Sequence, residues 1–199
     1  MRHSILFSIE RLLSRELEDC NTVLDLGCGN DSPVQHFDTV YSVGVDAFEP
    51  YLKESKDKSI HNDYVPALLS QVDFKPDSFD AVLLFFALEH MEKDSGRELL
   101  VKMNRWATKK IILATPNGYI RQDAIDNNPF MVHKSGWTVK ELEKLGLKVK
   151  GLYGWKRVGD KLVNNEYSLL WRGMAELTQL MAYFYPEKAF QLFAVHDVK

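Results

Sequence analysis

The stretch that most constrains the fold runs from Val23 to Asp31 and reads VLDLGCGND. A short apolar run that contains one acid is typical of a buried parallel strand. Gly27 and Gly29 predict a tight turn at the carboxyl end of that strand, where the backbone must pass close to another group. The rest of the chain is spaced as if to complete a pocket over this turn.

Apolar runs and amphipathic segments alternate through about residue 115, which predicts an α/β fold with a parallel sheet. Ser32 and Thr138 are expected as helix N-caps, the latter in a capping box with Glu141. We expect strands at 22–26, 40–45, 59–61, 78–86, 109–114, 147–153 and 189–195. Helices are expected at 4–18, 32–37, 50–55, 96–107, 138–145 and 167–184.

Length and charge narrow the function classes. A chain of 199 residues predicts a single domain, 1–199, with a helical insertion at about 155–188 between the last two strands. The net charge of −3 gives no reason to expect a nucleic-acid partner. Cys20 and Cys28 lack the spacing of a zinc site or a disulfide framework, so reduced thiols in a cytoplasmic protein are expected. The apolar patch near the N-terminus is too short for a signal peptide or a membrane span.

Asp46 is the sharpest candidate for ligand binding. It closes the second predicted strand, 19 residues after Gly27. A carboxylate at this place is suited to accept hydrogen bonds from both hydroxyls of a ribose. An adenosine-type ligand is therefore favoured over the alternative that Asp46 is a plain turn residue.

The charges around the glycine turn indicate which adenosine ligand it is. A dinucleotide site needs a third glycine three residues after Gly29, and Ser32 stands there instead. Asp25 and Asp31 also place negative charge where a pyrophosphate would lie. These acids suit S-adenosylmethionine, which carries an ammonium and a sulfonium and no phosphate, better than NAD.

With these motifs in place, the chain resembles the class I S-adenosylmethionine-dependent methyltransferases, of the type 11 or small-molecule-like family. Val23–Asp31 resembles the family's first motif, and further resemblances follow in the family's order at 43–46, 62–64, 78–91 and 111–117. The resemblance implies a Rossmann-like three-layer α/β/α sandwich. Its mostly parallel seven-stranded sheet would have the order 3-2-1-4-5-7-6, with one antiparallel strand.

The resemblance also implies roles for single residues. Gly27, Cys28 and Gly29 would approach the methionine part of the cofactor, and Asp25 would assist its ammonium directly or through water. Asp46 would hold the ribose, with Ala47 beside it and Phe48 stacking near the adenine. Asp63 would accept from the adenine amino group, with Tyr64 next to it. The backbone at Phe85 would meet the ammonium, and the apolar residues that follow predict an apolar wall near the transferred methyl.

Methyl transfer from a sulfonium is a one-step displacement that the protein mainly aligns. A base is needed only where the acceptor must lose a proton. His133 and His90 are the tentative catalytic residues, with Glu89 and Tyr119 as further candidates. The alternative for both histidines is a hydrogen bond within their loops.

The acceptor is expected to be a small molecule or a glycolipid-type compound, and a protein substrate stays open. The apolar helix at 167–185 is expected to pack on the sheet; the alternatives are a substrate lid, a homodimer face or a lipid contact. Methyl transfer would leave S-adenosylhomocysteine as the product of the cofactor. Two other functions stay open beside it. They are a non-catalytic S-adenosylmethionine-binding module and an NAD-dependent oxidoreductase.

Overall fold

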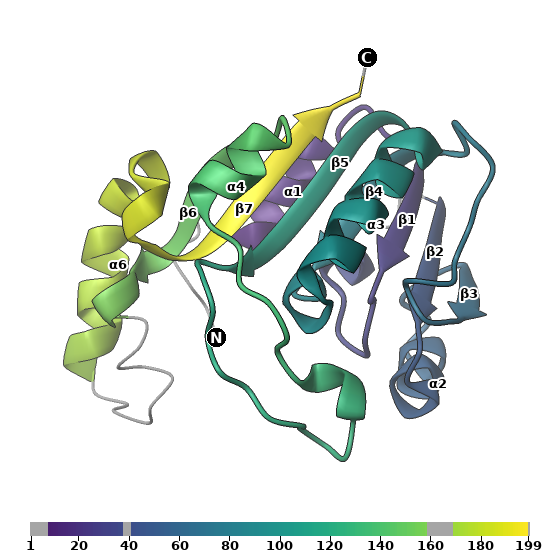
Figure 1. The fold of residues 1–199 in the computed structure, drawn as a ribbon, viewed down its shortest axis with the longest axis horizontal. Coiled ribbons are helices and arrows are strands. Elements are labelled where there is room, and N and C mark those ends of the chain that lie inside the picture. The colour runs from purple at the N-terminus through teal and green to yellow at the C-terminus, as the bar shows by residue number, and fades with distance from the viewer. Residues whose placement is uncertain (1–7, 38–40, 159–168, 199) are drawn as a thin grey trace.

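A computed structural model of the chain describes residues 8–37, 41–158 and 169–198. Seven strands form one sheet in the order β3-β2-β1-β4-β5-β7-β6, and β7 runs antiparallel to both of its neighbours (Figure 1). The strands are β1 Thr22–Leu26, β2 Tyr41–Asp46, β3 Asp63–Pro66, β4 Phe79–Phe85, β5 Ala107–Pro116, β6 Lys148–Trp155 and β7 Ala189–Asp197. The predicted strand order and the single antiparallel strand are confirmed.

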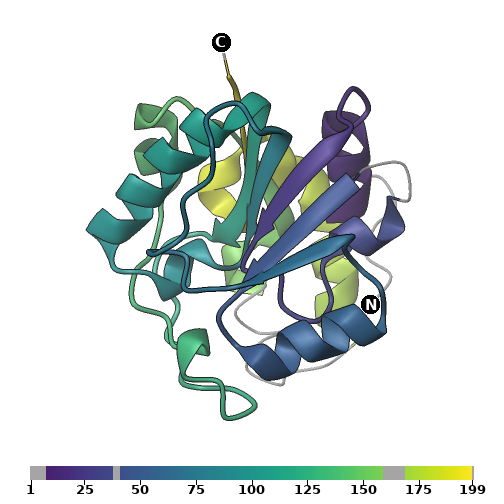
Figure 2. The same ribbon diagram turned by 90° about the vertical axis from the view of Figure 1, so that its right-hand side faces the viewer.

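Helices cover both faces of this sheet (Figures 1 and 2). The α-helices are α1 Ile9–Glu16, α2 Glu49–Asp57, α3 Lys93–Trp106, α4 Val139–Lys144 and α6 Leu169–Phe184. Short 3₁₀ helices lie at η1 Pro33–His36, η2 Leu88–His90, η3 Pro129–Met131 and η4 Pro186–Lys188. The result is the three-layer α/β/α sandwich that the family resemblance implies.

Alternating strand residues supply the two cores. Leu24 and Val82 face the core that contains α3 and α4, whereas Val23 and Leu83 face the core that contains α1. All four side chains are fully buried. Successive strand residues point to opposite faces of a sheet, so apolar residues in a row mean that both faces are covered.

Two of the predicted helix caps are confirmed. Ser32 Oγ accepts from the backbone N–H of Val34 at the start of η1. Thr138 forms the expected capping box with Glu141, whose carboxylate accepts from the Thr138 N–H. These local contacts depend on neighbouring residues alone, which is why the sequence predicts them.

The third strand differs from the prediction. The expected strand at 59–61 is wrong, because Ser59 takes a φ of 54° and the Ile60 N–H closes the end of α2 on the Ser55 carbonyl. The strand lies instead at β3, Asp63–Pro66. Helix α3 also starts at Lys93 rather than 96, while the expected start of the first helix at residue 4 falls outside the described residues.

Helix α6 lies between β6 and β7 and packs mainly on β6. Gln179 and Ala182 face inward and are buried. The expected packing of this helix on the sheet is confirmed. Part of its apolar face is nevertheless left uncovered, because five large apolar side chains are exposed: Leu177, Leu180, Met181, Phe184 and Tyr185. The extent of the domain over 1–199 stays a prediction.

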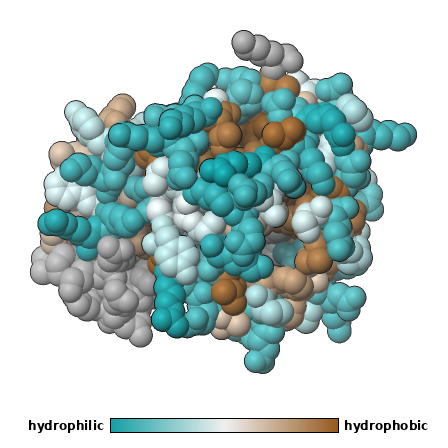
Figure 3. Space-filling view, in the orientation of Figure 1, coloured by the Kyte–Doolittle hydropathy of each residue, from teal (hydrophilic) through white to brown (hydrophobic). Residues whose placement is uncertain are grey.

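The face in Figure 3 is mostly hydrophilic, and its hydrophobic side chains lie in separate patches. None of the helices within the described ranges combines the length and the apolar character needed to cross a membrane.

Candidate active site

A pocket of about 450 Å³ opens at the carboxyl ends of β1, β2 and β4. The register brings these ends together, because Leu26 pairs with Val45 on one side and with Leu84 on the other. Ligands of open parallel sheets bind at this edge. Of the predicted site residues, the pocket is lined by Gly27, Cys28, Gly29, Asp46, Ala47, Phe85 and His90.

The glycine turn needs its glycines for two different reasons. Gly27 has a φ of 68°, and a Cβ at this position would lie 2.6 Å from the Cβ of Ala87. Gly29 has a φ of 56° but open space around its Cα. The turn therefore packs directly on the segment after β4 at Gly27, while at Gly29 only the backbone conformation requires glycine.

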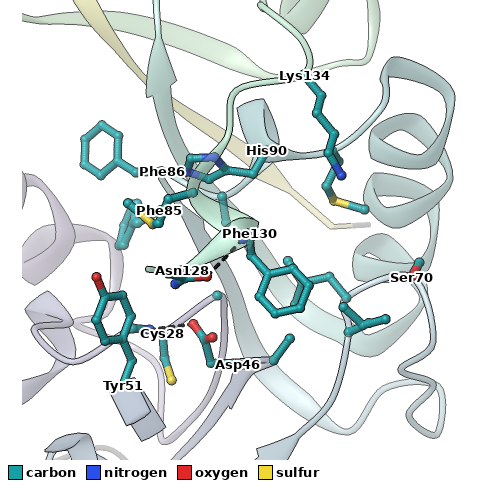
Figure 4. A pocket seen from close by; sticks show the side chains of 18 of the residues that line it. Cys28, Asp46, Tyr51, Ser70, Phe85, Phe86, His90, Asn128, Phe130 and Lys134 are labelled. Carbon is teal, nitrogen blue, oxygen red and sulfur yellow. Dashed lines mark hydrogen bonds between the residues drawn. The ribbon is translucent and has the colours of Figure 1, made fainter. Parts of the chain in front are cut away.

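Asp46 holds the turn and still faces the pocket (Figure 4). Its Oδ2 accepts from the Gly29 N–H at 3.0 Å and its Oδ1 from the Phe48 N–H at 2.8 Å. Burial raises the pKa of Asp46 above its ordinary value, and the N–H groups of Phe48, Gly29 and Ala47 oppose this rise. Each carboxylate oxygen keeps a second lone pair, so the pair of hydroxyls on a ribose fits this group.

Asp25 lies behind the turn. It is 2% exposed and does not line the pocket. Ser32 Oγ donates to its Oδ2 at 2.5 Å, and the Nε2 of the buried His61 lies 3.5 Å from the same oxygen. Burial raises the pKa of Asp25 to about 7. This position supports the turn from beneath and gives no direct path to a ligand ammonium.

The three aromatic and acidic residues expected near the adenine do not reach the pocket. Asp63 pairs with Val43 at the start of β3, away from the carboxyl end of the sheet, and accepts from the Tyr41 hydroxyl. Tyr64 donates its hydroxyl to the Ser55 carbonyl at 2.8 Å. Phe48 packs against Tyr51 with 4.9 Å between ring centroids, and it is Tyr51 that lines the pocket.

Leu68, Leu69 and Ser70 line the pocket, whereas Asp63 does not. They follow β3, whose last residue, Pro66, pairs with Asp46. Shifting the third strand from 59–61 to 63–66 moves the pocket edge to these residues. The only sequence signal for them is that they come directly after a strand of the parallel sheet.

The segment after β4 forms an apolar wall, as the sequence predicts. Phe85, Phe86, Ala87 and Met91 all line the pocket. Phe86 has a φ of 50°, which is uncommon for a bulky residue, and its N–H donates to the Ala114 carbonyl at 2.8 Å. Strained backbone of this kind clusters at functional sites because the surrounding fold holds it in place.

The two candidate histidines lie together but play different parts in the geometry. Their ring centroids are 4.8 Å apart. His90 lines the pocket, whereas His133 is buried behind it. Burial lowers the pKa of His90, and the Val132 and Phe86 carbonyls oppose this shift. Of the further candidates, Glu89 is buried and Tyr119 is exposed on the far side of His133.

The loop between β5 and α4 contributes residues that the sequence did not predict. Asn128, Phe130, Met131 and Lys134 line the pocket, and Figure 4 shows Asn128 and Phe130 between Asp46 and His90. Tyr51 donates its hydroxyl to Asp126 at 2.8 Å, which joins α2 to this loop. A polar loop gives no periodic pattern, so only its place after β5 connects it with the site.

These features fit S-adenosylmethionine and do not fit a dinucleotide. Residues 27–37, all of which are described, form only the four-residue η1 after the turn. An α-helix N-terminus, which binds the pyrophosphate of a dinucleotide, is missing from that segment. Gly27, Gly29 and Asp46 would hold the cofactor, which when bound supplies an electrophilic methyl group.

The methyltransferase domain family matches residues 24–114. Among solved structures, the chain is similar to the PH0226 protein from Pyrococcus horikoshii OT3, with a TM-score of 0.60, 14% identity, and coverage of 96% of this chain and 88% of that one. The chain is also similar to a SAM-dependent methyltransferase from Archaeoglobus fulgidus, with a TM-score of 0.57 and 18% identity. The match covers 94% of this chain and 94% of that one. A third similar structure is the N-terminal domain of EvdMO1 in the presence of SAH and D-fucose, with a TM-score of 0.61 and 12% identity. The match covers 96% of this chain and 81% of that one.

No curated protein sequence matches the chain. The matched residues include the glycine turn, Asp46 and the wall after β4, and the strand order is the one that the resemblance implies. Residues 24–114 are a methyltransferase domain, and the chain has the fold of S-adenosylmethionine-dependent methyltransferases.

Proposed function

We propose that this methyltransferase acts on a small-molecule or glycolipid-type acceptor. The observation that carries the proposal is that one pocket of about 450 Å³ is lined by both the cofactor turn and the apolar wall. Residues 128–134 of the loop after β5 close one side of it. A cavity of this size suits a compound of low molecular mass.

The charges around the pocket support the same class of acceptor. Asp31, Asp46 and Glu92 line it, against one lysine, Lys134. A nucleic-acid substrate would need several cationic side chains to neutralise its phosphates. An uncharged or weakly charged acceptor meets no such requirement.

Four residues supply the chemistry that we assign to the protein itself. Phe85 and Phe86 exclude water on the wall side and so favour alignment of the acceptor with the methyl group. Where the acceptor is a hydroxyl, His90 is placed to accept its proton because it lines the pocket. The ring of His133 packs against that of His90, with 4.8 Å between centroids, and is itself held by a contact of 2.6 Å between its Nδ1 and the Ile120 carbonyl. His133 is therefore placed to position His90.

One similar structure supports a sugar-containing acceptor. The N-terminal domain of EvdMO1 was crystallised in the presence of SAH and D-fucose. That protein has the fold of this chain and is 12% identical to it in sequence. We carry over the class of ligand as a proposal, which the experiment below tests.

Two further proposals concern the setting of the protein. Cys20 and Cys28 are both free and buried, which supports a reducing, cytoplasmic compartment. The exposed apolar residues of α6 support a homodimer through the 167–185 helix.

The experiment supplies methyl-labelled S-adenosylmethionine and a cell extract, which is separated afterwards into small polar compounds, organic-extractable lipids and macromolecules. We expect the label in the first or second fraction and much less of it with Asp46→Ala at the same cofactor concentration. Label confined to the macromolecules would contradict the proposed acceptor class. Binding of the cofactor without transfer to any fraction would favour the non-catalytic binding module.

A further inference from the structure

Three side chains at the edge of the pocket form a cluster that methyl transfer does not require: His90 lines the pocket, and Glu89 and His133 lie behind it. Glu89 and His90 belong to η2, and His133 comes from the loop after β5. One potential ligand atom from each residue lies within 4.8 Å of the others. Two imidazoles and one carboxylate are a donor set that divalent transition metals prefer.

The surroundings of the two histidines favour ligation. The Nδ1 atom of His90 lies 3.2 Å from the Val132 carbonyl, and the Nδ1 atom of His133 lies 2.6 Å from the Ile120 carbonyl. A carbonyl accepts only, so each contact places the proton on Nδ1 and leaves the lone pair on Nε2. Metal-binding histidines show this same arrangement, in which a carbonyl fixes the tautomer and the ring orientation.

Glu89 supplies a negative charge that lacks a cationic partner. It is 2% exposed, and Thr115 Oγ1 donates to its Oε2 at 3.0 Å. None of the ion pairs in the part of the chain that the structure describes involves Glu89. A buried carboxylate is costly unless it is neutralised or paired with a cation.

We propose that Glu89, His90 and His133 bind one divalent transition-metal ion, of the Zn²⁺ or Co²⁺ class. Ligand atoms around such an ion lie roughly 3.3–3.5 Å apart, so the widest pair would close by about 1–1.5 Å. Three protein ligands leave at least one position of a tetrahedral ion open to water or to an acceptor oxygen.

The ion would join two segments that shape the acceptor side of the pocket. The backbone N–H groups of Lys134 and Ser135 already donate to the Glu89 carbonyl at 2.8 and 3.0 Å. The ion adds side-chain bonds between the same two segments and fixes His90 at the pocket wall. A nitrogen that holds a metal does not accept a proton, so in the metal-bound protein His90 is a ligand and is not the proton acceptor proposed above for a hydroxyl substrate. The proposed metal site is argued from the geometry of these side chains alone, so it does not depend on which acceptor is methylated.

The test uses the full chain, stripped with a chelator, and titrates it with Co²⁺ while its visible absorption is recorded. Zn²⁺ is then added to displace the Co²⁺. We expect one equivalent of Co²⁺, displacement by Zn²⁺, and a rise in the thermal unfolding midpoint with either ion. Glu89→Gln and His133→Gln should each weaken binding by more than about 100-fold, and Thr115→Val by about 10- to 100-fold.

His196→Gln is the matched control. His196 also has its Nδ1 against a carbonyl, that of Gly146 at 2.9 Å, but it is only half-buried and lies outside the cluster. Its substitution should leave Co²⁺ binding unchanged. The proposal is overturned by stripped protein that takes up no Co²⁺, or by uptake that His133→Gln retains. The unfolding midpoint of each metal-free variant shows whether it has folded.

Discussion

The backbone N–H of Gly29 donates to Oδ2 of Asp46 at 3.0 Å, which joins the turn after β1 to the acidic end of β2. The same carboxylate accepts from the Phe48 N–H through its other oxygen. One side chain therefore fixes the turn that would approach the methionine part of the cofactor and faces the pocket where the ribose would lie. Loss of Asp46 should affect both.

Asp46→Ala should weaken S-adenosylmethionine binding by about 10- to 150-fold. The range corresponds to about 1.5–3 kcal/mol for hydrogen bonds to a charged group. Asp63→Ala is the matched control, because Asp63 lies at the start of β3 and its carboxylate contacts Tyr41 instead of the pocket. Calorimetric titration compares the two variants. Equal losses would return Asp63 to the adenine site.

Gly27→Ala should destabilise the protein more than Gly29→Ala does. Both positions have a positive φ, which costs a residue with a Cβ about 1–2 kcal/mol. Only at Gly27 does the new Cβ meet another atom, 2.6 Å away on Ala87, so a further cost of overpacking is expected there. Denaturant unfolding gives both free energies. Equal values would show that the turn does not pack on Ala87.

The buried His61 should make folding stability depend on pH. Burial lowers its pKa to about 4 in the folded protein, against about 6.5 in the unfolded chain. The unfolded chain therefore binds more protons between these values, and stability falls as the pH drops from 6.5 to 4, by about 3 kcal/mol at most.

His61→Asn removes this contribution. The difference in the free energy of unfolding, wild type minus variant, should decline as the pH is lowered from 6.5 to 4. The raised pKa of Asp25 acts in the opposite direction, because its folded form binds the extra proton. The His61 Nε2 lies 3.5 Å from Asp25 Oδ2, so the comparison is made with Asp25→Asn in both proteins. A difference that stays constant with pH would mean that His61 is protonated in the folded protein.

Phe184→Lys should convert a dimer into a monomer if α6 forms the subunit interface. Phe184 is 67% exposed and lies beside other exposed apolar residues of the same helix. Val101→Lys is the control, since Val101 is 71% exposed on α3, away from α6. Sedimentation at several concentrations separates the two forms. A wild type that sediments as a monomer throughout would remove α6 as an interface.

The sequence predicts the sheet because its signals are local. Buried strands such as β1 and β4 are continuous apolar runs, and the Thr138 cap depends on residues within one turn. The third strand has only four residues, two of them exposed, so its pattern is too weak to place it. That error of about four residues moved the predicted adenine contact to Asp63.

Contacts between distant segments explain what the sequence could not predict about the site. Asp25 reads as a ligand-facing acid, but Ser32 and His61 enclose it behind the turn. Tyr51 reaches the pocket because its hydroxyl contacts Asp126, 75 residues later. The pairing of His90 with His133 likewise depends on how the loop after β5 folds back over η2.

Calorimetry of the full chain with S-adenosylmethionine, S-adenosylhomocysteine and NAD tests the central claim most directly. The geometry of the turn and Asp46 predicts that both sulfur nucleosides bind at one site per chain and that Asp46→Ala weakens both. NAD should give no heat of binding at the same concentrations. Binding of NAD without binding of the other two would contradict the assignment of this pocket.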